Sequence, residues 1–314
     1  MNMIEQKKAT IRASSTRKQL GTGGPTHTYS LTSDVAMHLP VDPELEKVEF
    51  LLNAEKDTTL EVELWDTGRR ENYVPSTKQL AQSIAVRKGN EQWVTVKLPW
   101  HPDYPQNAFI IIKKNEQISL PMSDQPTTGI LTYKKGKKPL VNQNEAPDRQ
   151  PEQPVVRWSM RPFVRQTFLV NVYPETNAFS ADKITDGYHR PYGAPHLWIS
   201  NPLQNGKEEW VELNWDTPTR IREVQLIFND DVNEDLINLH HHKTPFDIIP
   251  ELVKEYRIEV ESEGDWIVIH EEKENRKRKQ QHYFRDNVVS SQLRVVVVST
   301  NGALSAEIVA VRVY

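Results

Sequence analysis

The chain has 314 residues, which is long enough for two domains of ordinary size. Its formal net charge of −4 gives no electrostatic reason to expect a nucleic acid or an anionic membrane as a partner. The absence of cysteine excludes disulfides, thiolate nucleophiles and cysteine-ligated metal sites, although it fits either side of a bacterial membrane.

Composition and periodicity together predict an all-β protein. The hydrophobic content of 37% is low, which suits β-sandwiches because their strands present one face to water. Short runs rich in valine and isoleucine are separated by proline, glycine and asparagine, the residues that punctuate strands. We therefore expect two β-sandwich domains.

Alternating apolar and polar residues predict strands in the first 133 residues, because every second side chain of a strand faces the core. Such patterns lie at residues 48–52, 60–64, 94–98 and 109–112, the last of them uniformly apolar as in a central strand. Only Lys78–Ala85 has a helical pattern. We predict an N-terminal β-sandwich over residues 1–133, opened by the segment Ala9–Ser14.

Residues 134–154 are polar, charged and rich in proline, which predicts a linker or an extended crossover between two domains. Strand patterns resume at Val155 and continue to the last residue. They lie at residues 155–160, 167–172, 211–215, 224–228, 256–260, 266–270, 293–297 and 308–314. We therefore predict a second sandwich over residues 155–314.

One stretch of the second half carries an ordered series of motifs. A loop built on Asp186-Gly187 is followed by Trp198-Ile199-Ser200 and then by the strand pattern Trp210–Trp215. This order resembles the discoidin or coagulation-factor type C domain. The resemblance implies that the second sandwich is a jelly roll with a galactose-binding-like fold.

Additional motifs resemble a narrower group, the C-terminal galactose-binding-like region of bacterial FAD-dependent oxidoreductases. These motifs are Ala9–Ser15, Asp186–Pro191, Trp198–Ser200, Ile227–Asp231, Leu252–Glu259 and Val311–Tyr314, so the resemblance extends over most of the chain. The chain departs from those enzymes because it has no Gly-rich strand-to-helix turn that could bind a dinucleotide. The resemblance therefore implies a non-catalytic accessory part without FAD of its own, whose partner is a FAD-dependent oxidoreductase catalytic domain.

The aromatic loop Tyr188–Trp198 is the best candidate for binding a ligand. Sugars pack their C–H faces on aromatic rings, and an arginine can bridge neighbouring hydroxyl groups. The candidate ligand-binding residues are Tyr188, His189, Arg190, Tyr192 and His196. The alternatives are that Trp198 belongs to the core and that Arg190 forms an internal pair.

The galactose-binding-like resemblance also implies a structural calcium ion held by Asp186 and Glu307, with Asp182 near enough in sequence to assist. Carboxylates and backbone carbonyls supply the hard oxygen ligands that calcium prefers. The chain departs from the usual pattern, since His196 and Leu197 replace the small hydroxyl residue before the tryptophan. In the alternative, Asp186 serves only to form a turn.

Three other clusters are interpreted as solvated loops. His240–His242 resembles a metal site, but consecutive residues of a strand point to different faces. Glu271–Lys279 contains four successive basic residues, yet nucleic-acid binding requires a broader basic surface with stacking aromatics. The acidic residues within Asp230–Asp235 could supply paired carboxylates for glycoside hydrolysis, but nothing in the sequence fixes their separation.

The sequence thus predicts a protein that binds a carbohydrate without catalysing a reaction and that orients a FAD-dependent oxidoreductase toward a glycan. The rival is a structural or protein–protein interaction module that packs on a catalytic domain and binds no sugar. Residues 1–20 contain no apolar segment typical of a signal peptide, which slightly favours the cytoplasm without fixing the compartment.

Overall fold

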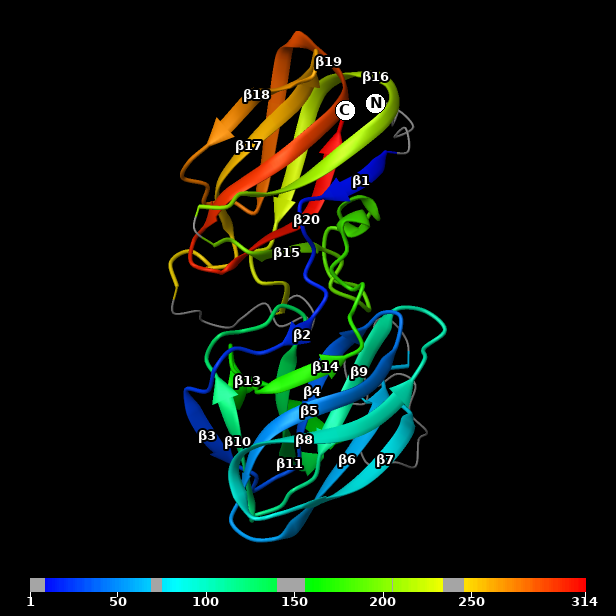
Figure 1. Ribbon diagram of the computed structural model, residues 1–314, viewed down its shortest axis with the longest axis vertical. Coiled ribbons are helices and arrows are strands. Elements are labelled where there is room, and N and C mark those ends of the chain that lie inside the picture. Colours follow the sequence, from blue (N-terminus) through cyan, green and yellow to red (C-terminus); the bar gives the residue numbers. More distant parts are fainter. Residues whose placement is uncertain (1–8, 69–74, 140–155, 205, 234–245) are drawn as a thin grey trace. The chain divides into compact units, whose positions relative to one another are not determined.

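The computed structural model describes residues 9–68, 75–139, 156–204, 206–233 and 246–314 (Figure 1). These residues divide into two compact units. We call residues 18–178 with 192–195 the first sandwich, and residues up to Arg17 with 179–191 and 196–314 the second sandwich. All of the described strand pairs are antiparallel. The predicted all-β fold with two β-sandwiches is confirmed.

The first sandwich consists of a six-stranded and a seven-stranded sheet. The six-stranded sheet has the order β12-β11-β4-β9-β6-β7, and the other follows β13-β10-β5-β14-β2, with β3 beside β10 and β8 beside β5. The bounds are β2 Leu20–Gly21, β3 His27–Ser30, β4 Val35–Val41, β5 Leu45–Ala54, β6 Thr58–Asp66, β7 Lys78–Val86, β8 Gly89–Trp100, β9 Gln106–Ile112, β10 Ile118–Ser123, β11 Leu131–Pro139, β12 Val156–Ser159, β13 Thr167–Phe168 and β14 Val170–Tyr173. One short 3-10 helix, η2 (Arg161–Phe163), precedes β13.

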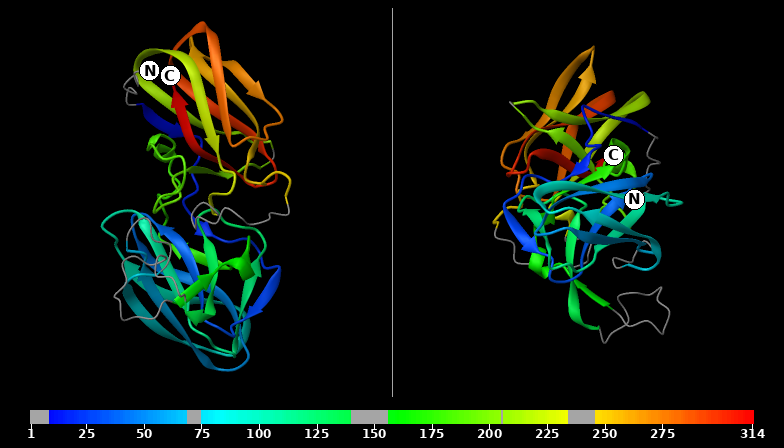
Figure 2. Two further views of the ribbon diagram at one scale, coloured as in Figure 1. Left: turned by 180° about the vertical axis from the view of Figure 1, so that it is seen from behind. Right: turned by 60° about the horizontal axis from the view of Figure 1, so that its bottom comes forward.

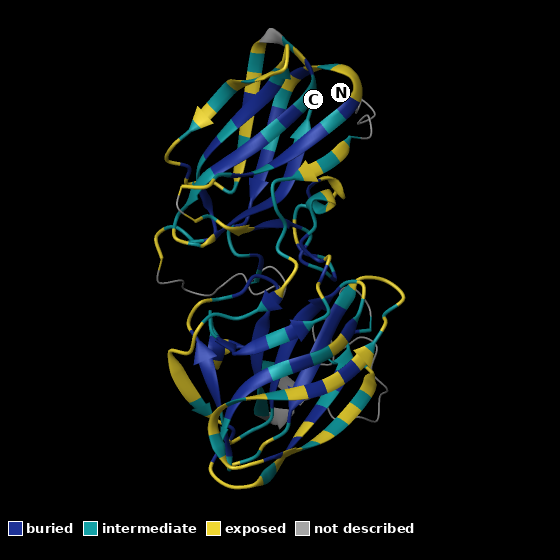
Figure 3. Cartoon of the chain, in the orientation of Figure 1, coloured by how far each residue is buried: buried dark blue, intermediate teal, exposed yellow. Residues whose placement is uncertain are grey.

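Alternating side chains build the core of the first sandwich, as the banded burial of its strands shows (Figure 3). On β6, Leu60, Val62 and Leu64 are fully buried, whereas Glu61 between them is exposed. The strands β4 and β9 are buried along almost their whole length. This burial on both faces is what the apolar run at residues 109–112 predicted.

The helical pattern predicted for Lys78–Ala85 is wrong. These residues form most of β7, which pairs with β6 from Lys78 to Val86. Long polar side chains such as those of Lys78 and Gln79 are good helix formers, so the local propensity favoured a helix. Backbone pairing with β6 outweighs that weak preference, since strand formation depends on the neighbouring strand rather than on the segment alone.

The second sandwich is built from one seven-stranded sheet in the order β15-β20-β16-β19-β17-β18, with β1 beside β16. The bounds are β1 Thr10–Ala13, η3 Ala181–Thr185, β15 Trp198–Pro202, β16 Glu209–Phe228, β17 Val253–Ser262, β18 Asp265–Glu272, β19 Lys279–Thr300 and β20 Ser305–Val313. The register between the long strands β16 and β19 shifts between Asn214 and Thr219. Val211 and Val224, on either side of this shift, belong to one core, so β16 bends and serves both layers (Figure 2).

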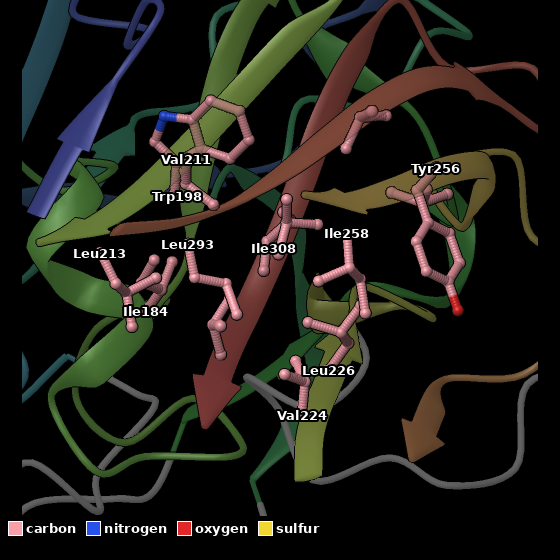
Figure 4. Close-up of a cluster of buried hydrophobic side chains, with 14 of the residues drawn as sticks. Ile184, Trp198, Val211, Leu213, Val224, Leu226, Tyr256, Ile258, Leu293 and Ile308 are labelled. Carbon is pink, nitrogen blue, oxygen red and sulfur yellow. The ribbon is translucent and has the colours of Figure 1, made fainter. Parts of the chain in front are cut away.

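Large apolar side chains fill the space between the two layers of the second sandwich (Figure 4). Trp198 from β15, Tyr256 from β17 and Ile308 from β20 are all fully buried. The indole Nε1 of Trp198 donates a hydrogen bond to the backbone carbonyl of Ser15 at 2.9 Å. Burial of the ring, with its only polar atom satisfied, confirms the interpretation of Trp198 as a core residue.

The N-terminal segment belongs to the second sandwich and not to the first. β1 pairs with β16, with Thr10 opposite Asn214, so the prediction that Ala9–Ser14 opens the first sandwich is wrong. The strands β12, β13 and β14 pair within the first sandwich, which therefore extends beyond the predicted boundaries at residues 133 and 155. The first sandwich is an insertion between Arg17 and Phe179 of the second. Of the predicted linker, residues 134–139 continue β11, and residues 140–154 lie outside the described residues.

Candidate ligand-binding site

The candidate loop begins where the short helix η3 ends. Ile184 anchors this helix in the core of the second sandwich. Oδ1 of Asp186 accepts a hydrogen bond from the backbone N–H of Tyr188 at 3.0 Å. Gly187 between them has a φ of +94°, a conformation that residues with side chains rarely adopt. Asp186 therefore forms the turn that the alternative to a calcium site predicted.

The Asp186 carboxylate also holds His196. Oδ2 of Asp186 lies 2.6 Å from Nδ1 of His196, and the side chains of the two residues are 21% and 12% exposed. The His196 ring stacks on the Tyr188 ring, with centroids 3.9 Å apart and planes inclined by 28°. Three residues singled out in the sequence thus form one packed group, which we call the ring pair with its aspartate. Its geometry is fixed by contacts within the protein.

Two arginines hold the backbone of the same loop. Arg278, which immediately precedes β19, donates from Nη2 to the backbone carbonyl of His189. Its Nη1 lies 3.2 Å from Oδ1 of Asp230. Arg312 on β20 donates from Nη2 to the backbone carbonyl of Gly187 at 3.4 Å. The loop is therefore tied to the strands of the second sandwich as well as to its own side chains.

The environment of His189 shows that these strands are positively charged near the loop. Burial lowers the pKa of His189, and the charges of Arg312, Lys279 and Arg278 lower it further. Only Arg278 among these three cations is paired with a carboxylate in the described part of the chain. An anion placed beside His189 would therefore be attracted by Lys279 and Arg312.

The sequence did not predict that Arg278, Lys279 and Arg312 lie near the loop. It interpreted Glu271–Lys279 as a solvated hairpin, which agrees with the exposed side chains of Arg276 and Lys277. Arg278 is instead half-buried against the loop, and Lys279 is the first residue of β19. The run of basic residues was visible, but its proximity to His189 depends on the pairing of β19 with β16, which the sequence does not specify.

The remaining predicted ligand-binding residues are not all brought together. Arg190 is exposed and follows His189 in the loop. Tyr192 belongs by its contacts to the first sandwich, and its backbone N–H donates to the carbonyl of Ala194. The candidate site is therefore confined to the second sandwich, with Tyr188, His189, Arg190 and His196 from the prediction.

The predicted calcium ligands do not fit a calcium site. Glu307 on β20 is buried, and its Oε2 accepts a hydrogen bond from Nδ2 of Asn229 at 2.6 Å. Both carboxylate oxygens of Asp186 are hydrogen-bonded, to His196 and to the backbone of Tyr188. Among the described residues, no group of three or more His, Asp or Glu side chains is placed to hold a metal ion. A calcium ion prefers carboxylate oxygens as ligands, and those of Asp186 are instead occupied by N–H groups of the protein.

The other clusters noted in the sequence contribute little to the site. His240–His242 lie outside the described residues, as do Glu234 and Asp235. Asp230 is paired with Arg278, and Asp231 donates its backbone N–H to Oδ1 of Asn229. Within the described residues, no helix is long and apolar enough to cross a membrane.

Comparisons with known proteins find similarity only at the level of structure. No protein-family model matches the chain, and no curated protein is similar to it. The chain is similar to chitosan-binding module 1 of a chitosanase/glucanase from Paenibacillus sp. IK-5, with 15% identity and a TM-score of 0.33 over 44% of this chain and 86% of that one. It is similar to the family 32 carbohydrate-binding module of Streptococcus pneumoniae EndoD, with 14% identity and a TM-score of 0.32 over 45% and 90% of the two chains. It is also similar to the family 32 module of C. perfringens NanJ in complex with galactose, with 10% identity and a TM-score of 0.31 over 42% and 82%.

Proposed function

We propose that the protein is a non-catalytic carbohydrate-binding protein that holds a saccharide at the loop Asp186–Arg190 of its second sandwich. The observation that carries this proposal is the ring pair of Tyr188 and His196, locked by the carboxylate of Asp186. Aromatic rings give the C–H face of a sugar an apolar surface to pack against. A ring that is already held in place loses little conformational freedom when the ligand binds.

Polar groups at the same loop suit the hydroxyl groups of a sugar. Arg190 is exposed, and its planar guanidinium can donate to two neighbouring hydroxyls at once. Each such hydrogen bond replaces one to water, so the net gain is small. We therefore expect a dissociation constant of about 0.1–1 mM for a single sugar.

We further propose that the protein serves as an accessory to a FAD-dependent oxidoreductase, which it orients toward a glycan. The support is the resemblance of motifs such as Asp186–Pro191 and Val311–Tyr314 to the accessory region of those enzymes. The flavin would then be bound by a different polypeptide or region. A neighbouring reading frame that encodes a Rossmann-type FAD domain would support this partner, and a genome without such a gene would refute it.

A structural or protein–protein interaction role is the second candidate, and the edge strand β18 favours it. β18 lies at the end of its sheet and exposes Ile267 and Val268, each at 49%. An edge strand has unpaired backbone groups, and exposed apolar side chains on it promote association with another chain. In this case the module would pack on a catalytic domain and bind no sugar.

A glycan array followed by titration calorimetry tests the carbohydrate function. Tyr188→Ala should weaken binding by about 1 kcal/mol or more, because it removes half of the ring pair. The matched control is Tyr104→Ala, which truncates a tyrosine of the first sandwich that is 36% exposed. Failure of every saccharide to bind at millimolar concentration, or equal binding by wild type and Tyr188→Ala, would refute the proposal and favour the structural role.

A further inference from the structure

The strands next to the loop have an outer face that carries a mixture of polar, basic and aromatic side chains. β20, β16 and β19 lie side by side in the second sandwich (Figure 1). Val224 and Leu226 of β16 and Val311 of β20 point into the core. The residues that alternate with them therefore point outward.

The strand register arranges these outward residues in rows across the three strands. In the first row Ile227 lies between Ala310 and Lys279, and of these only Lys279 is exposed, because Ile227 and Ala310 are buried. In the second row Gln225 lies between Arg312 and Gln281, and in the third Glu223 lies opposite Tyr283. The first two rows adjoin the loop, because Lys279 acts on the pKa of His189 and Arg312 contacts the carbonyl of Gly187. The rows thus lead away from the ring pair with its aspartate.

The third row supplies a second aromatic ring. Tyr283 is 68% exposed, the most exposed of the large hydrophobic side chains in the described part of the chain. The second row, which lies between this ring and the loop, contains the amide side chains of Gln225 and Gln281. Their Nε2 atoms both donate to Oε1 of Glu223, at 2.7 and 3.2 Å. These two hydrogen bonds hold Glu223, whose side chain is the only carboxylate in the three rows, in place.

The charges on this face favour an anion. Lys279 and Arg312 form no ion pair with any described residue, and the three rows contain these two cations against the single carboxylate of Glu223. The face therefore has a local excess of positive charge, although the whole chain has a net charge of −4. Surface cations that are not paired with a carboxylate attract acidic groups over several ångströms, and salt screens that attraction.

We propose that this outer face extends the saccharide site, and that the natural ligand is an acidic oligosaccharide, a sugar chain bearing carboxylate or sulfate groups. This inference rests on the proposed carbohydrate function. Tyr283 offers a stacking surface, the glutamine amides face the hydroxyl groups, and Lys279 and Arg312 pair with the acidic groups. Lys279 and Tyr283 are separated by about 13 Å along β19, so the face accommodates more than one sugar ring.

Titration calorimetry with three ligands of matched length tests this inference: an oligogalacturonate, a neutral galacto-oligosaccharide and a sulfated galacto-oligosaccharide. At least one acidic ligand should bind about tenfold more tightly than the neutral one, and this preference should shrink as the salt concentration rises. Whether the carboxylated or the sulfated ligand binds more tightly identifies the acidic group that the face prefers.

Two variants and a matched control connect the preference to this face. Lys279→Gln should lower the affinity for the acidic ligand about fivefold and leave the neutral ligand unaffected. Tyr283→Ala should lower the affinity for oligomers but not for the monosaccharide. The control is Lys273→Gln, which neutralises an exposed lysine of the β18–β19 connection that is paired with Glu271 and does not act on His189. It should bind like the wild type.

The outcomes separate this inference from the function on which it rests. If acidic and neutral ligands bind equally, or if neither Lys279→Gln nor Tyr283→Ala changes the affinity for the acidic oligomer, the extended site is refuted. The carbohydrate function stands in that case, provided that Tyr188→Ala still weakens binding. If no saccharide binds at all, both proposals fail.

Discussion

Removal of the hydroxyl groups of Ser14 and Ser15 should destabilise the second sandwich, although both residues precede the whole first sandwich in the sequence. Both hydroxyls donate to Oε2 of Glu209, whose side chain is fully buried at the start of β16. Ser14 Oγ also accepts a hydrogen bond from the backbone N–H of Trp210 at 2.8 Å, and Ser15 Oγ accepts one from Asn201 at 3.0 Å. The two serines thus link the N-terminal segment to two strands of the second sandwich.

The size of the effect follows from these contacts. The Ser14→Ala/Ser15→Ala variant removes two hydrogen bonds to a charged acceptor, each worth about 1.5–3 kcal/mol. The losses are less than additive because both hydroxyls bind one oxygen, while Nζ of Lys207 remains 2.8 Å from the other. We expect a combined loss of about 3–5 kcal/mol in the free energy of unfolding. Such a loss lowers the Tm of a domain of this size by roughly 6–20 °C.

Differential scanning calorimetry measures this shift in the transition of the second sandwich. Ser180→Ala is the matched control, because the Ser180 side chain makes no capping hydrogen bond at η3. It should change stability by no more than about 0.5 kcal/mol. If the double variant melts like this control, the serines do not hold Glu209 and the assignment of the N-terminal segment to the second sandwich is refuted.

The same contacts predict a dependence on pH. Burial raises the pKa of Glu209, but the ion pair with Lys207 and the hydrogen bonds from Ser14 and Ser15 outweigh burial, so the pKa lies below the ordinary value of 4.5. A carboxyl group with a lowered pKa stabilises the fold above its unfolded pKa and loses that contribution as the pH falls. The difference in Tm between wild type and the double variant should therefore narrow below about pH 4.5. A difference that stays constant down to acidic pH would contradict a charged Glu209.

Four further predictions follow from single features. The rings of His270 and His282 lie with their centroids 3.8 Å apart, and burial lowers the pKa of both, that of His282 to about 4. Acid should therefore destabilise the second sandwich as the pH falls from 6.5 to 4. His282→Gln should recover about 2–3 kcal/mol of that loss at pH 4 in a series of melting curves. Trp198→Ala should cost about 3–5 kcal/mol in urea unfolding, and a cost below about 1 kcal/mol would contradict its core position. A chelator should leave the Tm unchanged, since the oxygens of Asp186 are occupied by N–H donors, and a fall in Tm on chelation would restore the calcium site. The purified protein should show no flavin absorbance, and a stoichiometric bound flavin would refute the accessory role.

Most of the strands could be predicted because their signal is local. The pleat of a strand sends alternate side chains to opposite faces, so Leu60, Val62 and Leu64 of β6 and Val224, Leu226 and Phe228 of β16 show their buried faces in the sequence alone. β7 was missed because its exposed polar side chains suit a helix as well as an edge strand. Strands with one apolar face can therefore be predicted from the segment alone, whereas β7 forms because it pairs with β6.

Domain boundaries could not be predicted, because strand pairing depends on residues far away in the sequence. The segment Ala9–Ser14 and the strand β14 both have ordinary strand patterns, and neither pattern indicates which strand it will pair with. The structure pairs β1 with β16, about 200 residues further along, and β14 with β5. A linker rich in proline suggested a boundary at 134–154, but the chain returns to the first sandwich after it.

Part of the candidate site could likewise be predicted from the sequence, whereas the rest depends on the fold. Aromatic residues in a loop with proline and glycine are visible in the sequence, and the turn at Asp186-Gly187 has the expected chemistry. The contact of His196 with Asp186 was not predicted, because nine residues separate them in the sequence and only the folded loop brings their side chains together. Lys279 and Arg312 were not predicted for the same reason, because they reach the loop from two different strands.

The motifs behind the family resemblance are physically connected in the second sandwich. Ser15 of the first motif accepts the indole hydrogen of Trp198 from the third, and Arg17 beside it donates its backbone N–H to Ile199. Asp230 of the fourth motif pairs with Arg278, which holds the loop of the second. These contacts stabilise the second sandwich and position its loop. The resemblance therefore bears on the architecture of the second sandwich. The ligand proposed above would depend on Tyr188 and Arg312, which lie within those motifs, and on Lys279 and Tyr283, which lie outside them.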